Sequence, residues 1–241
     1  MIEPNRIKAM VPTSVRSVLR NRLVAPVRFW AGYDGPYADM LGGNTLDTVL
    51  RHCRFETVLD VGSGAGRHAD IMAEDGRQVT AIDFGVSIYY QRRGPNRTDI
   101  IGDYYQYNFD QPFDCVWACH VLEHQPNPNE FLKKIHRDLR EDGWLAITVP
   151  PLKHEIVGGH LSLWNAGLLL YHLVFAGFDC RQASVRTQGY NVSVVVRKRT
   201  IENLPELHYD SGDIERLSAY FPDIMSERCD GRIRRHRWPP S

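Results

Sequence analysis

A short apolar run leads directly into a glycine-rich turn, and this feature limits the possible folds more than any other in the chain. Residues 57–61 are strand-like, and the segment Gly62–Gly66, with glycine at positions 62, 64 and 66, follows without a spacer. Glycine at every second position lets the backbone turn sharply and approach a ligand closely. The helix expected from Arg67 would present its free N–H groups at the same point. This order of strand, tight turn and helix predicts a ligand-binding α/β unit.

Apolar runs alternate with helical stretches through the middle of the chain. Two helices are expected. Arg67–Asp75 ends at Gly76, and Asn129–Leu139 is amphipathic and is followed by an Asp142-Gly143 turn. Strands that alternate with helices predict a parallel sheet covered on both faces. The five strands expected to be parallel are Thr57–Val61, Gln78–Ile82, Asp99–Gly102, Phe113–Cys119 and Trp144–Val149.

The pattern changes towards the end of the chain. Two strand-like runs, Phe178–Thr187 and Tyr190–Arg199, are separated only by Gln188-Gly189, which predicts a hairpin. The expected fold is therefore a Rossmann-like, doubly wound α/β fold with a mostly parallel seven-stranded sheet that ends in an antiparallel hairpin. We expect three regions: an N-terminal helical extension (1–50), a core (51–200) and a C-terminal appendage (201–241).

The glycine turn discriminates between cofactor classes. The dinucleotide fingerprint Gly-x-Gly-x-x-Gly would require glycine at position 67, which is Arg, and Asp60 would repel a pyrophosphate. The segment Val58–Ala69 instead resembles motif I of the class I S-adenosylmethionine-dependent methyltransferases. Asp83 ends the second strand where that family binds the ribose hydroxyls, and Gly102-Asp103 ends the third strand where it contacts the adenine. The resemblance covers about residues 55–199.

The fourth strand extends the resemblance. It ends at Cys119 and continues through His120 into Val121-Leu122-Glu123-His124, which is similar to the small-molecule branch of the family. The resemblance implies the methyltransferase fold, S-adenosyl-L-methionine as cofactor, and a set of residues that contact it. These residues are Asp60, Gly62, Ser63, Gly64, Gly66, Asp83, Phe84, Gly102, Asp103, Tyr104, Cys119 and His120.

Methyl transfer to a hydroxyl needs a base, and histidine titrates in the useful range. Four of the ten histidines follow the fourth or fifth strand, and we expect the catalytic base among them: His120, His124, His154 and His160. Each can equally be a packing residue. No dedicated cluster of metal ligands is visible in the sequence, so we expect no metal.

The acceptor class stays open at this stage. The Asp/Asn-Pro-Pro-aromatic pattern of many nitrogen methyltransferases is absent after the fourth strand, which favours O-methylation of a small molecule or sugar. The segment Gly159–Asn165 resembles methyltransferases of bacterial surface-polysaccharide clusters, so a polysaccharide or glycolipid precursor is one expected acceptor. A lipophilic, quinone-like metabolite is the alternative, with the apolar stretch 164–175 lining its pocket. A non-catalytic module that binds S-adenosylmethionine is the third possibility.

Charge and cysteine content bear on partners and location. The chain has 29 basic and 29 acidic side chains, but residues 1–30 carry +5, residues 226–241 carry +3, and the body between them −8. The acidic body disfavours nucleic acid as a partner, while the basic ends could contact an anionic membrane or glycolipid. An odd number of cysteines, without a CxxC pair or a recognisable signal peptide, indicates a cytoplasmic protein, peripheral to the membrane at most. The oligomeric state is not predicted.

Overall fold

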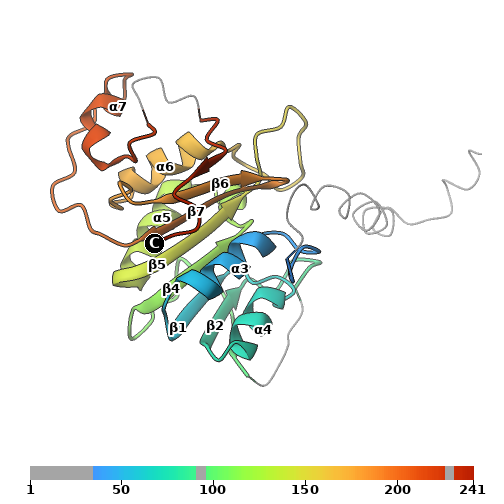
Figure 1. Cartoon of the computed structure of the whole chain (residues 1–241). Coiled ribbons are helices and arrows are strands. Elements are labelled where there is room, and N and C mark those ends of the chain that lie inside the picture. Colours follow the sequence, from blue (N-terminus) through green and yellow to red (C-terminus); the bar gives the residue numbers. More distant parts are fainter. Residues whose placement is uncertain (1–34, 91–95, 226–230) are drawn as a thin grey trace, which may run out of the picture.

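An eight-stranded sheet organises the molecule in the computed structural model, which describes residues 35–90, 96–225 and 231–241 (Figure 1). Its strand order is β3-β2-β1-β4-β5-β7-β6-β8. Strands β1 to β5 run parallel, and β7 pairs antiparallel with both β5 and β6. This arrangement confirms the predicted Rossmann-like sheet with its closing hairpin. The strands are β1 (Thr57–Val61), β2 (Gln78–Asp83), β3 (Thr98–Ile101), β4 (Phe113–Cys119), β5 (Leu139–Val149), β6 (Ser184–Gln188), β7 (Asn191–Arg197) and β8 (Arg235–His236).

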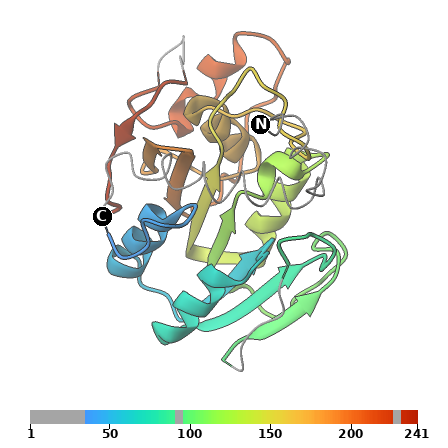
Figure 2. The same cartoon turned by 90° about the vertical axis from the view of Figure 1, so that its right-hand side faces the viewer.

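Helices cover both faces of this sheet. Figures 1 and 2 show α3 and α4 on one face and α5 and α6 on the other. Each face has its own hydrophobic core: one is built around Trp117, Leu46 and Met72, the other around Phe131 and Trp164. The helices are α3 (Gly43–His52), α4 (Arg67–Glu74), α5 (Pro128–Asp138), α6 (Ala166–Phe175) and α7 (Asp213–Arg216), with short 3-10 turns η1 (Leu122–His124) and η2 (Ser218–Tyr220).

Asparagine side chains begin the two helices that cover the larger core. The Asn127 side chain accepts a hydrogen bond from the Glu130 N–H before α5, and Asn165 does the same for the Leu168 N–H before α6. Such caps satisfy N–H groups that a helix start leaves without partners. None of the helices in the described ranges combines the length and apolar character that crossing a bilayer requires.

The structure departs from the sequence predictions at several connections. The helix α5 passes directly into β5 at Leu139, whereas the strand was expected only from Trp144. The connection over residues 102–112 contains turns and no helix, because it is too short for a crossover helix. The expected boundary at residue 50 falls inside α3, which packs against the sheet. The C-terminal residues add an unpredicted eighth strand, and Trp238 joins the core that α3 covers.

Parts of two sequence predictions fall outside the described residues. These are the helical N-terminal extension up to residue 34 and a fraction of the basic C-terminal end, residues 226–230, which includes Cys229. The other four cysteines, Cys53, Cys115, Cys119 and Cys180, are free thiols.

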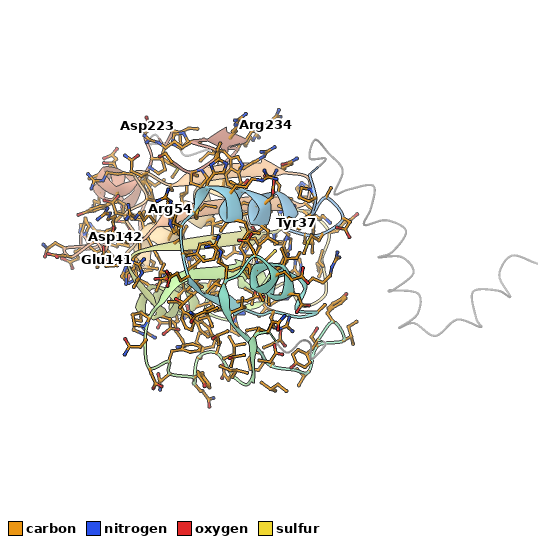
Figure 3. All side chains as sticks on the ribbon, turned by 60° about the horizontal axis from the view of Figure 1, so that its bottom comes forward. Tyr37, Arg54, Glu141, Asp142, Asp223 and Arg234 are labelled. Atoms are coloured by element: carbon orange, nitrogen blue, oxygen red, sulfur yellow. The ribbon has the colours of Figure 1, made fainter. Side chains whose placement is uncertain are left out.

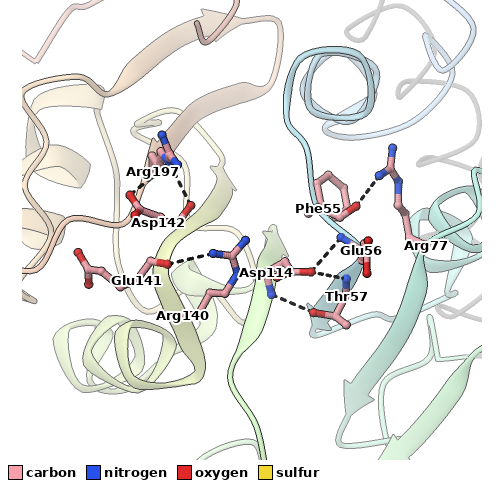
Figure 4. A network of polar contacts seen from close by, with 9 residues as sticks. All are labelled: Phe55, Glu56, Thr57, Arg77, Asp114, Arg140, Glu141, Asp142 and Arg197. Atoms are coloured by element: carbon pink, nitrogen blue, oxygen red, sulfur yellow. Dashed lines mark hydrogen bonds and ion pairs between the residues drawn. The ribbon is translucent and has the colours of Figure 1, made fainter.

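A dense set of polar contacts closes the amino ends of the parallel strands (Figure 4). The Asp114 carboxylate accepts hydrogen bonds from the backbone N–H groups of Glu56 and Thr57, both at 2.9 Å, and pairs with Arg140 Nε at 2.5 Å. Although burial raises its pKa, these donors outweigh that effect and hold the pKa of Asp114 at about 2. In Figure 3, Glu141 and Asp142 lie at this end of the molecule and Tyr37 lies at the other.

Candidate active site

The candidate site lies at the opposite edge of the sheet, where β1, β2, β4 and β5 end and the antiparallel strand β7 begins. In open α/β sheets, ligands bind outside the carboxyl ends of the strands. Because β1 to β5 run parallel, the geometry brings the residues predicted at the ends of all five strands to this edge. It also brings there the start of β7, which the sequence analysis placed in the hairpin without assigning it to the site.

The glycine turn adopts a conformation that requires its glycines. Gly62, Gly64 and Gly66 have φ angles of 71°, 52° and 70°, in the left-handed region that side chains disfavour. A Cβ atom at Gly62 would lie 2.6 Å from Val121 Cγ2. A Cβ at Gly64 would meet no atom of the described residues within 4 Å, so this glycine faces open space. Ser63 closes the turn, because its carbonyl accepts the Gly66 N–H at 2.8 Å.

Asp83, at the end of β2, is oriented by the turn. Its Oδ2 accepts the Gly64 N–H at 2.9 Å and its Oδ1 accepts the Gly85 N–H at 2.8 Å. Each carboxylate oxygen therefore has further acceptor capacity beyond one backbone donor. The next residue, Phe84, is 55% exposed. This places a fixed anion and an accessible aromatic ring side by side at the edge.

Asp60 lies under the turn and is almost completely buried. Its Oδ2 has no hydrogen-bond partner in the part of the chain that the structure describes. Burial raises its pKa to about 7, an effect that Arg97 opposes and Asp83 reinforces. The Arg97 guanidinium is 2% exposed, pairs with Asp70 and with Asp99 (2.8 Å), and donates to the Gly66 carbonyl at 2.9 Å. No sequence pattern signalled this arginine, because its partners come from α4, β3 and the turn.

The end of β3 only partly matches the prediction. Gly102 and Asp103 lie at the edge, and Asp103 accepts the Tyr105 N–H at 2.9 Å. Tyr104 is 5% exposed and packs edge-on against Phe131 in the core, so its contact with a cofactor stays a prediction. Its neighbour Tyr105, which is 37% exposed, is the accessible aromatic residue of this turn.

His120 follows β4 and has a positive φ of 55°. Its Nε2 lies 3.0 Å from Asn191 Oδ1, and the same oxygen accepts the Gly42 N–H at 3.0 Å. Because that oxygen is an acceptor, His120 Nε2 must donate to it. The Nδ1 atom lies 3.3 Å from Glu123 Oε1, and Tyr190 stacks on the ring at 5.8 Å. Each nitrogen of His120 thus faces a protein group, Asn191 at the start of β7 or Glu123 of η1, and Tyr190 covers the ring.

The histidines of the two loops meet around Glu123. His124 Nε2 lies 3.8 Å from Glu123 Oε1, and the His124 and His160 rings are edge-to-face at 4.9 Å. Glu123 is completely buried. Burial lowers the pKa of His160, which Glu123 opposes. His154 is exposed and is not part of this cluster. Three of the four predicted histidines therefore converge on Glu123 and His154 does not, and the catalytic role of all four stays a prediction.

Cys119 ends β4 beside the converging histidines. Its side chain is only partly exposed, and desolvation raises the pKa of its thiol far above the ordinary value. A Cβ atom at Gly42 would lie 2.7 Å from Cys119 Sγ, so the segment before α3 packs directly on this thiol. The structure thereby places Cys119 beneath the site, and its predicted contact with the cofactor stays a prediction.

A comparison with known families agrees with the fold and the order of the motifs. Residues 59–147 match a family described as methyltransferase domain. This segment begins in β1 and ends in β5, so it includes the glycine turn, Asp83, Glu123 and His124, but not His160. This match to a methyltransferase domain agrees with the S-adenosylmethionine-dependent methyltransferase that the sequence motifs predict.

Particular relatives match smaller parts. The ubiquinone biosynthesis O-methyltransferase of Pseudomonas paraeruginosa is 33% identical over 96 residues, which cover 36% of this chain and 41% of that protein. The protein of the same name from Xanthomonas oryzae pv. oryzae is 27% identical over 140 residues, 53% of this chain and 59% of that protein. The chain thus spans about two-fifths of the length of the first of these relatives.

Solved structures share the architecture. A 1,6-didemethyltoxoflavin-N1-methyltransferase from Burkholderia thailandensis, with S-adenosylhomocysteine bound, has a TM-score of 0.52 and 22% identity, covering 78% of this chain and 90% of that one. A TehB-like methyltransferase from Corynebacterium glutamicum has a TM-score of 0.52 and 22% identity, covering 77% and 98%. At this identity the likeness establishes the fold only.

Proposed function

We propose that this chain transfers the methyl group of S-adenosylmethionine to a hydroxyl oxygen of a lipophilic small molecule. The supporting observation is an apolar border beside the Glu123 cluster. On the loop after β5, Leu152, Ile156 and Leu161 are 55%, 97% and 64% exposed, and Leu161 is adjacent to His160. Pockets for small molecules combine an apolar lining with a few convergent polar groups, which is the combination at this edge.

The residues of the glycine turn fit the cofactor. The open side of Gly64 leaves room for its methionine part, and the unpartnered Oδ2 of Asp60 suits an ammonium group, directly or through water. The free lone pairs of Asp83 suit the ribose hydroxyls, and Phe84 flanks them. Gly102 and Asp103 are the proposed adenine contacts. When bound, S-adenosylmethionine supplies an electrophilic methyl group.

The transfer is an in-line displacement. The carbon–sulfur bond breaks as the carbon–oxygen bond forms, S-adenosylhomocysteine leaves as a neutral thioether, and the acceptor proton is lost. Much of the acceleration comes from holding the acceptor oxygen in line with the methyl group. We propose that the cluster of His120, Glu123, His124 and His160 faces the acceptor oxygen and receives or displaces its proton. The names of the matched ubiquinone relatives also support a lipophilic acceptor.

The test uses methyl-labelled S-adenosylmethionine and three acceptor sets: phenols and catechols with an alkyl chain, the same rings without the chain, and nucleotide sugars with glycolipids. We expect label in the chain-bearing phenols and less transfer when the chain is removed. Transfer to sugars alone would replace the lipophilic acceptor by the sugar acceptor predicted from the sequence. Cofactor binding without transfer, to these acceptors or to an extract of the host, would favour the non-catalytic module.

Asp83→Ala controls for the cofactor site. Loss of its charge-assisted hydrogen bonds, about 1.5–3 kcal/mol, predicts an S-adenosylmethionine affinity about 10–150-fold weaker by calorimetry. Unchanged affinity would contradict the placement of the ribose. Asp103→Ala tests the proposed adenine contact in the neighbouring turn in the same way.

A further inference from the structure

Glu123, His124 and His160 each direct one ligand atom into the same small volume. These atoms all lie within 4.8 Å of one another. We propose that these three residues bind one divalent transition-metal ion of the Zn²⁺ class, which coordinates the acceptor hydroxyl. The role in catalysis rests on the proposed function, whereas the binding of the ion does not.

The buried carboxylate is the strongest indication of a missing cation. Glu123 has no exposed surface, and neither Oε1 nor Oε2 has a hydrogen-bond partner among the residues that the structure places. The nearest side-chain nitrogen of an ionisable group is His120 Nδ1, 3.3 Å from Oε1. A buried carboxylate without hydrogen bonds is expensive unless it is paired or coordinates a metal. Oε2 has neither a hydrogen bond nor an ion pair among the described residues, so a bound cation would stabilise the carboxylate.

The tautomer of His124 suits ligation. Its Nδ1 lies 2.7 Å from the Gly159 carbonyl, an oxygen that can only accept, so Nδ1 carries the proton. Nε2 therefore presents its lone pair towards Glu123. Histidines that bind metals typically donate their other ring N–H to a carbonyl or carboxylate, which fixes the orientation of the ring.

Backbone contacts hold the third ligand in place. The Glu123 carbonyl accepts the Leu161 N–H at 2.7 Å and the Ser162 N–H at 3.3 Å, which ties the loop after β5 to η1. Gly159 has a φ of 83°, and a Cβ atom there would lie 3.2 Å from His124 Nδ1. The loop thus approaches the His124 ring closely, and the next residue, His160, lies beside the carboxylate.

The geometry and the ligand types favour a transition metal. Ligand atoms about 2.1 Å from one ion lie about 3.4 Å apart in a tetrahedral site. The 3.8 Å between His124 Nε2 and Glu123 Oε1 needs only a small closure. Two imidazoles and one carboxylate form the ligand set of catalytic zinc sites that keep a position open, whereas Mg²⁺ prefers oxygen ligands.

The charge of such a site complements an ionised acceptor. A divalent cation and one carboxylate leave a net charge of +1, which an alkoxide or phenolate oxygen neutralises. Coordination lowers the pKa of the hydroxyl, so its proton leaves to solvent before the oxygen attacks the methyl group. The carbon–sulfur bond then breaks, the carbon–oxygen bond forms, and no oxidant or reductant is needed.

The experiment measures metal binding by the full chain after treatment with a chelator. Calorimetry with Zn²⁺ and the absorption spectrum with Co²⁺ should show one saturable site, with Mg²⁺ much weaker. Glu123→Gln and His160→Ala should each weaken Zn²⁺ binding by at least about 10-fold. His52→Ala, which removes an exposed histidine at the end of α3, is the matched control and should bind like the wild type.

Two results would overturn the inference: no saturable Zn²⁺ or Co²⁺ site in the wild type, or unchanged affinity in His160→Ala. Should Glu123→Gln fail to fold, His160→Ala decides, with circular dichroism and S-adenosylmethionine binding as checks on its fold. Methyl transfer that persists in chelator, without a metal site, removes the metal and leaves the proposed function intact. A metal site without transfer to any hydroxyl removes the proposed function and leaves the metal.

Discussion

The two edges of the sheet differ in how completely the carboxylates near them are hydrogen-bonded. At the amino edge, Asp114 has three donors, and its pKa lies at about 2 (Figure 4). At the carboxyl edge, Asp60 and Glu123 are more deeply buried, yet they retain oxygens without hydrogen-bond partners in the described ranges. At the amino edge, Asp142 Oδ1 also lacks a hydrogen-bond partner among the described residues, but it pairs with Arg199 at 2.8 Å. Because unsatisfied buried groups lower stability, the oxygens of Asp60 and Glu123 indicate that a ligand is expected at the carboxyl edge.

The Arg97 guanidinium lies at the carboxyl edge, yet we expect it to stabilise the fold. It therefore tests whether that edge serves ligand binding alone. Arg97→Ala removes the buried cation that faces Asp70 and Asp99, and we expect a loss of about 3–5 kcal/mol in the free energy of unfolding. The measurement is denaturant unfolding. Arg67→Ala is the control: its pair with Asp39 is exposed, and the expected loss is at most about 1 kcal/mol. Equal losses would refute the structural role of Arg97.

The glycine turn offers a test that separates steric conflict from backbone strain. Gly62→Ala combines a left-handed φ with the contact to Val121, for an expected loss of about 2–4 kcal/mol. Gly64→Ala has the strain alone, for about 1–2 kcal/mol. Thermal unfolding should rank the two in this order. Gly64→Ala should nevertheless weaken S-adenosylmethionine binding, because its new methyl group enters the open space; normal affinity there would place the cofactor elsewhere.

A substitution at the amino edge should lower the stability of the fold and leave the affinity for S-adenosylmethionine unchanged. Asp114→Ala loses charge-assisted hydrogen bonds, for an expected loss of about 1.5–3 kcal/mol at neutral pH. Since the folded pKa lies below the ordinary value of 3.8, this contribution is present above about pH 4 and disappears as the pH falls through about 2. Denaturant unfolding from pH 7 downwards measures the convergence of variant and wild type. A change in S-adenosylmethionine affinity would show that the two edges are coupled.

The pH dependence of cofactor binding tests the role of Asp60 at the carboxyl edge. Its folded pKa of about 7 exceeds the ordinary 3.8, so the unliganded fold loses stability as the pH rises from about 4 to about 7. A cationic cofactor favours the ionised form, so its affinity should rise from pH 6 to pH 8 by several-fold and then level off. Calorimetry over this range measures it, and Asp60→Asn should flatten the profile. A profile equally steep in Asp60→Asn would assign the dependence to another group.

Local sequence signals were sufficient for the strands and for the cofactor turn. The alternation of apolar runs, the glycines at 62, 64 and 66, and the acid at 83 are each determined within a few neighbouring residues. The strand bounds of β1 and β4 were predicted correctly to the residue. The eighth strand was missed because β8 has only two residues, and its pairing with β6 depends on a return of the chain over about 50 residues.

The sequence by itself therefore determined the sheet, its parallel core and the class of cofactor, because period, glycine spacing and strand order are local properties. Tertiary structure alone decided three contacts. Arg97 donates to the glycine turn, Asn191 accepts a hydrogen bond from His120, and Glu123 lies beside His160 of another loop. Those contacts join residues between 31 and 71 positions apart. No local pattern encodes them, since they form only when the parallel strands bring their carboxyl ends to one edge.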